Sequence, residues 1–134
     1  MIPKTIARYV PLLLSLVVAG MMSTCGAPGK VRLNINDAGR QIELKRGQSF
    51  DISLESNPTT GFSWEIAELD EKIVAPSAEA EFTPQAERIG AGGVQVFHFR
   101  AVGAGQTSLT LVYRRSWEKG VAPQRSYTLD ILVP

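Results

Sequence analysis

Residues 49–55, which read Ser49-Phe50-Asp51-Ile52-Ser53-Leu54-Glu55, decide the fold of this chain. Three large apolar residues alternate strictly with four polar ones, and each of the polar side chains can carry charge or make hydrogen bonds. Successive side chains of a β-strand point to opposite faces, so this segment predicts a strand with one apolar face and one wet face. A structure that buries such a face needs a second layer against it.

The same period of two recurs on both sides of this segment. Polar turns containing Gly, Pro, Asn or Asp separate the repeats. The alternating apolar positions lie at residues 31–35, 42–44, 64–66, 109–113 and 127–133. No segment of the chain shows an apolar stripe at helical spacing. The pattern predicts an all-β fold, specifically an immunoglobulin-like antiparallel β-sandwich of seven or eight strands in a single domain.

Two stretches depart from the simple pattern. Between Val94 and Ala101 the apolar phase slips by one residue, which a β-bulge or a covered edge strand would explain. Residues 78–82 alternate small or aromatic residues with glutamates and predict a further, more polar strand.

The N-terminus has the features of an export signal. Lys4 and Arg8 precede an apolar run of 13 residues, 10–22, which is too short to span a bilayer. Cys25, the only cysteine, follows this run as in a bacterial lipobox and is a candidate for lipidation. We therefore expect a signal peptide over residues 1–24, a flexible tether over 25–30 and a folded domain over 31–134. An ordinary signal cleaved after Gly20 is the alternative.

These features predict an exported protein, either a periplasmic or outer-membrane lipoprotein or a secreted one. Residues 25–134 carry 12 basic and 13 acidic residues. A charge balance so close to zero does not predict the basic surface that binds nucleic acid or an anionic membrane. Attachment to a membrane would therefore depend on a lipidated Cys25.

Three inter-strand segments carry distinctive residues. The first is Asn57-Pro58-Thr59-Thr60-Gly61-Phe62, in which proline and glycine can hold two threonines at a stiff tip. The second is Gly90-Ala91-Gly92-Gly93, whose missing side chains allow a close backbone approach. The third contains Arg115-Ser116-Trp117, residue types common at binding hot spots. Loops of a sandwich cluster at its two ends, so these three segments can share one edge.

These motifs resemble the chagasin family of cysteine protease inhibitors. Residues 57–62 match that family's Asn-Pro-Thr-Thr-Gly-Phe loop, residues 90–93 are similar to its glycine-rich loop, and residues 115–117 are similar to its Arg-Pro-Trp loop, with Ser116 in place of proline. The order and approximate spacing of the motifs agree across residues 31–134.

The resemblance implies a reversible inhibitor of papain-like cysteine proteases that plugs the active-site cleft with three loops. Thr59 and Thr60 would then sit by the protease's catalytic cysteine. Arg115 and Trp117 would dock on the primed side of the cleft, and the backbone of 90–93 would run along the unprimed side.

Two other function classes compete with this interpretation. An enzyme would need chemistry around His98, the only histidine, which lies mid-strand in phase with Arg100, while Cys25 lies in the leader. A non-inhibitory envelope module could bind peptide, glycan or a partner subunit through the same loops. We expect no enzymatic activity, no metal, no cofactor and a monomeric chain.

Overall fold

The computed structural model describes residues 29–134. The expected signal peptide, Cys25 and most of the tether lie outside the described residues. Within the described part of the chain, no helix is long and apolar enough to cross a membrane.

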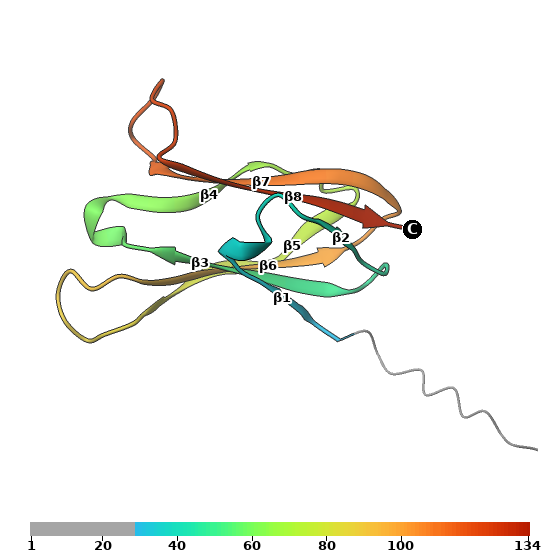
Figure 1. The fold of residues 1–134 in the computed structure, drawn as a ribbon, viewed down its shortest axis with the longest axis horizontal. Coiled ribbons are helices and arrows are strands. Elements are labelled where there is room, and N and C mark those ends of the chain that lie inside the picture. The colour runs from blue at the N-terminus through green and yellow to red at the C-terminus, as the bar shows by residue number, and fades with distance from the viewer. Residues whose placement is uncertain (1–28) are drawn as a thin grey trace, which may run out of the picture.

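Eight strands form two sheets of four that pack face to face (Figure 1). Sheet I has the strand order β1-β3-β6-β5, and sheet II has the order β2-β8-β7-β4. The strands and two short 3-10 helices are β1 (Val31–Leu33), η1 (Ile35–Asp37), β2 (Gln41–Glu43), β3 (Ser49–Ser56), η2 (Pro58–Thr60), β4 (Phe62–Glu68), β5 (Val74–Pro84), β6 (Gly93–Ala101), β7 (Gly105–Arg115) and β8 (Arg125–Val133). The all-β sandwich expected from the sequence is confirmed.

The inner faces of the two sheets form one apolar core. Its buried members follow the predicted alternation in β3, β7 and β8, because every second residue of these strands points between the sheets. Phe50 and Phe99 stack with ring centroids 5.2 Å apart at the centre of sheet I. The buried hydrophobic residues are Leu33, Leu44, Phe50, Ile52, Leu54, Trp64, Val74, Phe97, Phe99, Ala101, Leu109, Leu111, Tyr113, Tyr127, Leu129, Ile131 and Val133.

The sandwich is antiparallel except at two edges, where β1 pairs parallel with β3 and β2 pairs parallel with β8. The chain crosses from one sheet to the other between these short strands, and η1 forms on the way. Ile35 therefore does not continue β1 as the alternation predicted. Asn34 and Asp37 explain this difference. The side chain of Asn34 accepts from the N–H of Asn36 at 2.9 Å, and the Asp37 carboxylate accepts from the N–H of Asn34 at 2.9 Å, which starts a helical turn.

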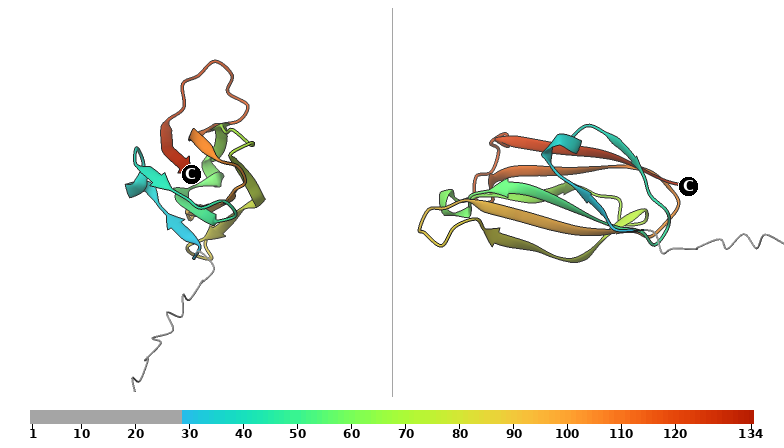
Figure 2. Two further views of the ribbon diagram at one scale, coloured as in Figure 1. Left: turned by 90° about the vertical axis from the view of Figure 1, so that its right-hand side faces the viewer. Right: turned by 60° about the horizontal axis from the view of Figure 1, so that its bottom comes forward.

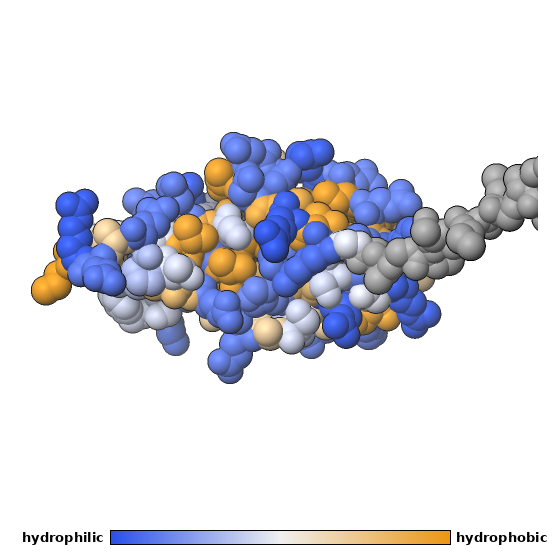
Figure 3. Space-filling view, turned by 90° about the horizontal axis from the view of Figure 1, so that it is seen from below, coloured by the Kyte–Doolittle hydropathy of each residue, from blue (hydrophilic) through white to orange (hydrophobic). Residues whose placement is uncertain are grey.

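The phase slip in 94–101 has a different cause from the bulge expected in that strand. β6 pairs with β3 without any register shift. Val94 and Val96 instead lie on the outer face of sheet I, where Figure 3 shows apolar residues among charged ones. Gln95 takes the inward position between them. Its side-chain amide donates to the carbonyl of Trp64 and accepts from the N–H of Trp64, both at 3.0 Å. An inward polar residue thus ties the two sheets together.

The polar strand expected at 78–82 is confirmed as part of β5, the outer strand of sheet I. The register irregularities of this sheet lie in β5, between Pro76 and Ala78 and again between Ala78 and Glu81. Most of β5 is exposed to solvent, because only Val74 at its start is buried.

A charged network crosses the outer face of sheet I. Asp51 of β3 pairs with Lys30 at 2.9 Å and with the Nδ1 of His98 at 2.7 Å, and the Nε2 of His98 lies 3.5 Å from Glu81 of β5. Burial acts to raise the pKa of Asp51, but the hydrogen bonds and charges of Lys30 and His98 outweigh it, so its pKa lies below the ordinary value.

A lowered pKa for Asp51 has a predictable effect on stability. Its carboxylate stabilises the fold at pH values above its unfolded pKa, and this contribution is lost as the pH falls through the folded pKa. We predict that Asp51→Asn lowers the free energy of unfolding at neutral pH, and that the difference from wild type shrinks below about pH 4. Urea unfolding of both proteins between neutral and acidic pH measures this difference in the free energy of unfolding. Glu43→Gln, at an exposed position of β2, is the control. A difference that stays constant down to pH 2 would contradict this prediction.

Candidate functional site

The three distinctive segments meet at one end of the sandwich, although they are far apart in the sequence. Figures 1 and 2 show the β3–β4, β5–β6 and β7–β8 connections at this end, and the C-terminus at the opposite end. We call residues 57–61, 85–92 and 116–124 at this end the loop edge. The structure thus brings together the residues that the sequence singled out.

Asn57 organises the first loop. Its side-chain oxygen accepts from the hydroxyl of Thr59 at 2.5 Å, and its carbonyl accepts from the hydroxyl of Thr60 at 2.7 Å. Pro58, Thr59 and Thr60 form the 3-10 turn η2, which ends at Gly61 in the left-handed conformation with φ of 83°. Both threonines are exposed at the tip, yet their hydroxyl groups fix the backbone below them.

The first and second loops contact each other through the same asparagine. The side-chain Nδ2 of Asn57 donates to the carbonyl of Gly90 at 3.4 Å. A Cβ on Gly92 would lie 3.4 Å from the carbonyl oxygen of Ser56. Gly93 is not a loop residue but the first residue of β6, and a Cβ there would collide with the carbonyl of Thr83. The glycines therefore allow the backbone of residues 92–93 to lie close to the backbone of Ser56 and of Thr83.

The third loop packs against the first through Trp117. The indole is 65% exposed, and its ring lies directly over Gly61, where any Cβ would collide with it. Only glycine provides both the positive φ and the space that this contact requires. Trp117 is neither in the core nor at the far end from Thr59, so its exposed face lies beside the threonine tip.

Arg115, the last residue of β7, contacts the first and third loops of the loop edge. Its Nε donates to the carbonyl of Thr60 at 3.1 Å, and its guanidinium lies 4.5 Å from the centre of the Phe62 ring. Its terminal nitrogen Nη1 pairs with the carboxylate of Glu118 at 3.0 Å, across the turn that holds Ser116 and Trp117. Arg115, which we expected to dock on a protease, therefore also braces the first loop against the third.

Ser116 occupies the second position of that turn. The N–H of Glu118 donates to the carbonyl of Arg115 at 3.1 Å, which closes a four-residue turn. Proline is favoured at the second position of such turns, and serine is also tolerated there. Here the ion pair between Arg115 and Glu118 supplies a restraint on the turn that a proline ring would supply by fixing φ.

Aromatic residues form a rigid base under the loop edge. The hydroxyl of Tyr113 accepts from the N–H of Asn57 at 3.0 Å, and the ring of Tyr113 packs at 5.4 Å from Phe62 and 5.2 Å from Trp64. The indole N–H of Trp64 donates to the carbonyl of Glu55 at 2.9 Å. The loops are therefore anchored to both sheets, which limits the conformations open to them.

Sequence reasoning missed one exposed residue of the loop edge. Ile89 precedes Gly90 and is fully exposed, with a relative accessibility of 105%. A lone isoleucine among polar and glycine residues was the available signal, because a large apolar side chain at a solvated tip gains nothing in the free protein.

The one histidine and the acidic side chains of the described residues lie as follows. His98 lies on the outer face of sheet I, bonded to Asp51 and away from the loop edge. Within residues 29–134, no group of three or more His, Cys, Asp or Glu side chains could hold a metal ion.

Comparison with known proteins identifies the family. The sequence profile described as chagasin family peptidase inhibitor I42 matches residues 43–131. This chain belongs to the chagasin family. Chagasin of Trypanosoma cruzi is 32% identical over 83 residues, which cover 59% of this chain and 76% of chagasin. Amoebiasin-1 of Entamoeba histolytica is 33% identical over 95 residues, or 69% of this chain and 88% of the relative.

Solved structures agree with the fold of this chagasin-family protein. The cysteine protease inhibitor EhICP2 of Entamoeba histolytica superposes with a TM-score of 0.71 at 23% identity, covering 78% of this chain and 96% of that one. PbICP-C, solved in complex with falcipain-2, superposes with a TM-score of 0.52 at 14% identity, covering 78% and 98%. The relatives are protease inhibitors, so family membership argues against the enzyme alternative.

The contact between Trp117 and Gly61 can be tested by adding one methyl group. We predict that Gly61→Ala displaces the indole and costs about 1–2 kcal/mol of stability from the positive φ. Gly47→Ala is the matched control, because Gly47 has φ of 87° but open space around it. Both variants should lose similar backbone stability, and only Gly61→Ala should shift the NMR signal of the Trp117 indole N–H. An unchanged indole signal in Gly61→Ala would contradict the packing described here.

Proposed function

We propose that this chain is a reversible inhibitor of papain-like cysteine proteases, and that the loop edge plugs their active-site cleft. The observation that carries the proposal is the linkage of three exposed loops into one braced surface. Asn57 joins the first loop to the second, and Arg115 and Trp117 join it to the third. Because these loops are held before binding, little conformational entropy remains to be lost on docking, which favours affinity.

The threonine tip suits a plug that is not consumed. Thr59 and Thr60 lie in a 3-10 turn whose hydroxyl groups bond to Asn57. A peptide bond in such a tight turn is not presented in an extended form, and straightening it would break both hydrogen bonds. We place Thr59 and Thr60 at the catalytic cysteine of the protease, where they block access to it.

The two flanking loops provide the affinity beside this plug. The exposed face of Trp117 supplies a large apolar surface on one side, the residue type most common at hot spots. Residues 90–92 present backbone groups on the other side, and we add Ile89 to this contact because its exposed side chain can be buried there. Arg115 acts mainly through the first loop, by holding the carbonyl of Thr60.

A direct titration tests the proposal. All buried hydrophobic residues of the described part of the chain lie between Leu33 and Val133, so a chain of residues 26–134 retains this core. We predict stoichiometric, reversible inhibition of papain by this chain, measured with a fluorogenic substrate. Trp117→Ala should weaken inhibition by roughly 30-fold or more, and Thr59→Ala and Ile89→Ala by smaller factors, without a change in unfolding midpoint.

Val102→Ala is the control for these variants, since Val102 is an exposed apolar residue that follows β6 outside the loop edge. No inhibition at micromolar protein would favour the non-inhibitory module. Inhibition that none of the loop variants weakens would leave an inhibitor whose site lies elsewhere.

We further propose that the protein is exported and acts from an envelope or secreted location, anchored by lipid on Cys25. The sequence of the leader supports export, and the described chain enters the sandwich at the end away from the loop edge (Figure 2). An anchor at that end would leave the loops free to meet a protease. Mass spectrometry of the mature N-terminus should find an acylated Cys25, and a free N-terminus upstream of it would contradict the anchor.

A further inference from the structure

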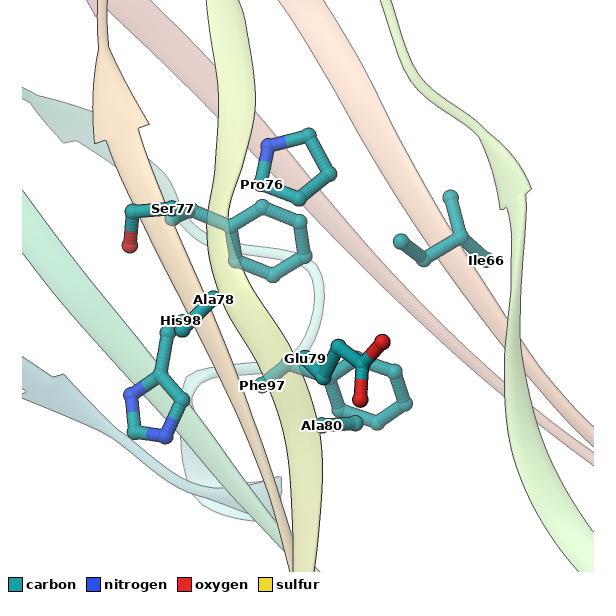
Figure 4. Close-up of a pocket in the computed structure, with 9 residues that line it drawn as sticks. Ile66, Pro76, Ser77, Ala78, Glu79, Ala80, Phe97 and His98 are labelled. Carbon is teal, nitrogen blue, oxygen red and sulfur yellow. The ribbon is translucent and has the colours of Figure 1, made fainter.

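A cavity opens on the side of the sandwich, between the outer strands β4 and β5. Its volume is about 460 Å³. Figure 4 shows that Ile66 of β4 faces Pro76 and Glu79 of β5 across it, with Phe97 of β6 behind Glu79, while His98 lies on the opposite side of β5 from Ile66. The cavity thus reaches from the surface to aromatic side chains of the core, because Phe97 is 6% exposed.

The irregular course of β5 keeps this cavity open. The register of β5 against β6 shifts between Pro76 and Ala78 and again between Ala78 and Glu81, beside the cavity. Small side chains at Ala78 and Ala80 leave the space unfilled. An apolar pocket of this size next to a sheet edge can accept a side chain from another molecule.

The free backbone of β4 lies along the same opening. At Trp64 the Gln95 amide pairs with both the N–H and the carbonyl, on the side of β4 that faces away from β7. Gln95 therefore acts as a short substitute for a neighbouring strand. Alternate residues of a strand direct their hydrogen-bonding groups to the same edge, so the N–H of Ile66, which lies just before the register shift of β4, also points to this free edge. Among the side-chain hydrogen bonds of the described residues, those to the backbone of β4 are at Phe62 and Trp64, and none is at Ile66.

Two carboxylates beside this opening lack ion-pair partners within residues 29–134. Glu79 lines the cavity, and Glu68 is the last residue of β4, two residues after Ile66. Glu65 pairs with Arg114 and Glu81 lies near His98, whereas no salt bridge of the described residues involves Glu68 or Glu79. The rim of the cavity therefore favours a ligand with positive charge.

We propose that the side of the sandwich between β4 and β5 binds an extended, basic segment of a partner protein. The segment adds a strand to sheet II at Ile66, and one of its apolar side chains enters the cavity toward Phe97. Lysine or arginine residues of the segment lie against Glu79 and Glu68. Backbone pairing at a free edge combined with a side-chain pocket is a common mode of peptide recognition. The site is separate from the loop edge, so a protease and this partner can be bound at the same time.

A titration with a synthetic peptide tests this site. The probe is Lys-Val-Lys-Leu-Lys-Val-Lys, added up to about 1 mM to isotopically labelled residues 26–134. We expect amide shift changes confined to β4 and β5, and slower hydrogen exchange of the Ile66 amide because it gains an acceptor. Inhibition of papain should not change. Glu79→Lys should weaken binding by about tenfold, and Ile66→Lys should abolish it.

Glu43→Lys is the matched control, since Glu43 lies on β2, the other outer strand of sheet II, and should bind the peptide like the wild type. Equal binding of the acidic peptide Glu-Val-Glu-Leu-Glu-Val-Glu would overturn the proposal. So would the absence of shift changes in β4 and β5 at the highest peptide concentration. Concentration-dependent dimerisation through the same residues, without peptide binding, would assign the edge to a second copy of this chain instead.

Discussion

Burial of two apolar sheet faces against each other is the constraint on which the rest of this structure depends. Neither sheet is stable alone, because each has one face rich in leucine, isoleucine and aromatic residues that water would surround. Once the faces meet, the positions of strand ends are fixed, and with them the positions of the connections. Loops that are more than 20 residues apart in the sequence then lie at one end because the strands they join run antiparallel.

At that end, packing alone would leave the loops free to move. Hydrogen bonds and aromatic contacts remove this freedom in steps: Tyr113 holds the N–H of Asn57, Asn57 holds the threonine tip, and Arg115 holds the carbonyl of Thr60. The indole of Trp117 then covers Gly61. Rigidity and exposure are therefore combined in the same residues, which is the property an inhibitory plug requires.

The free edge of β4 is satisfied at one position and open at another. Gln95 satisfies the edge of β4 at Trp64, next to the loops, where an open edge would weaken the base under them. Farther along β4 the edge is open at Ile66, and the register of β5 against β6 shifts beside the cavity there. Natural proteins usually protect free edges with charge or irregular strands, and the glutamates and register shifts of β5 serve that purpose here. The protection is selective, since it repels acidic segments and admits basic ones.

The sequence by itself determined the sandwich, because the period of two in 49–55 and its repeats requires strands with one buried face. It also determined the three motifs of the loop edge, since Pro58, Gly61 and Trp117 are unusual enough to be identified locally. Only the tertiary structure decided what depends on partners distant in sequence. The phase slip around Gln95 is explained only by its contact with Trp64, and the role of Arg115 in the loops is explained only by its bond to the carbonyl of Thr60. Periodicity reports which face a side chain is on, whereas its hydrogen-bonding partner is set by which strands become neighbours in space.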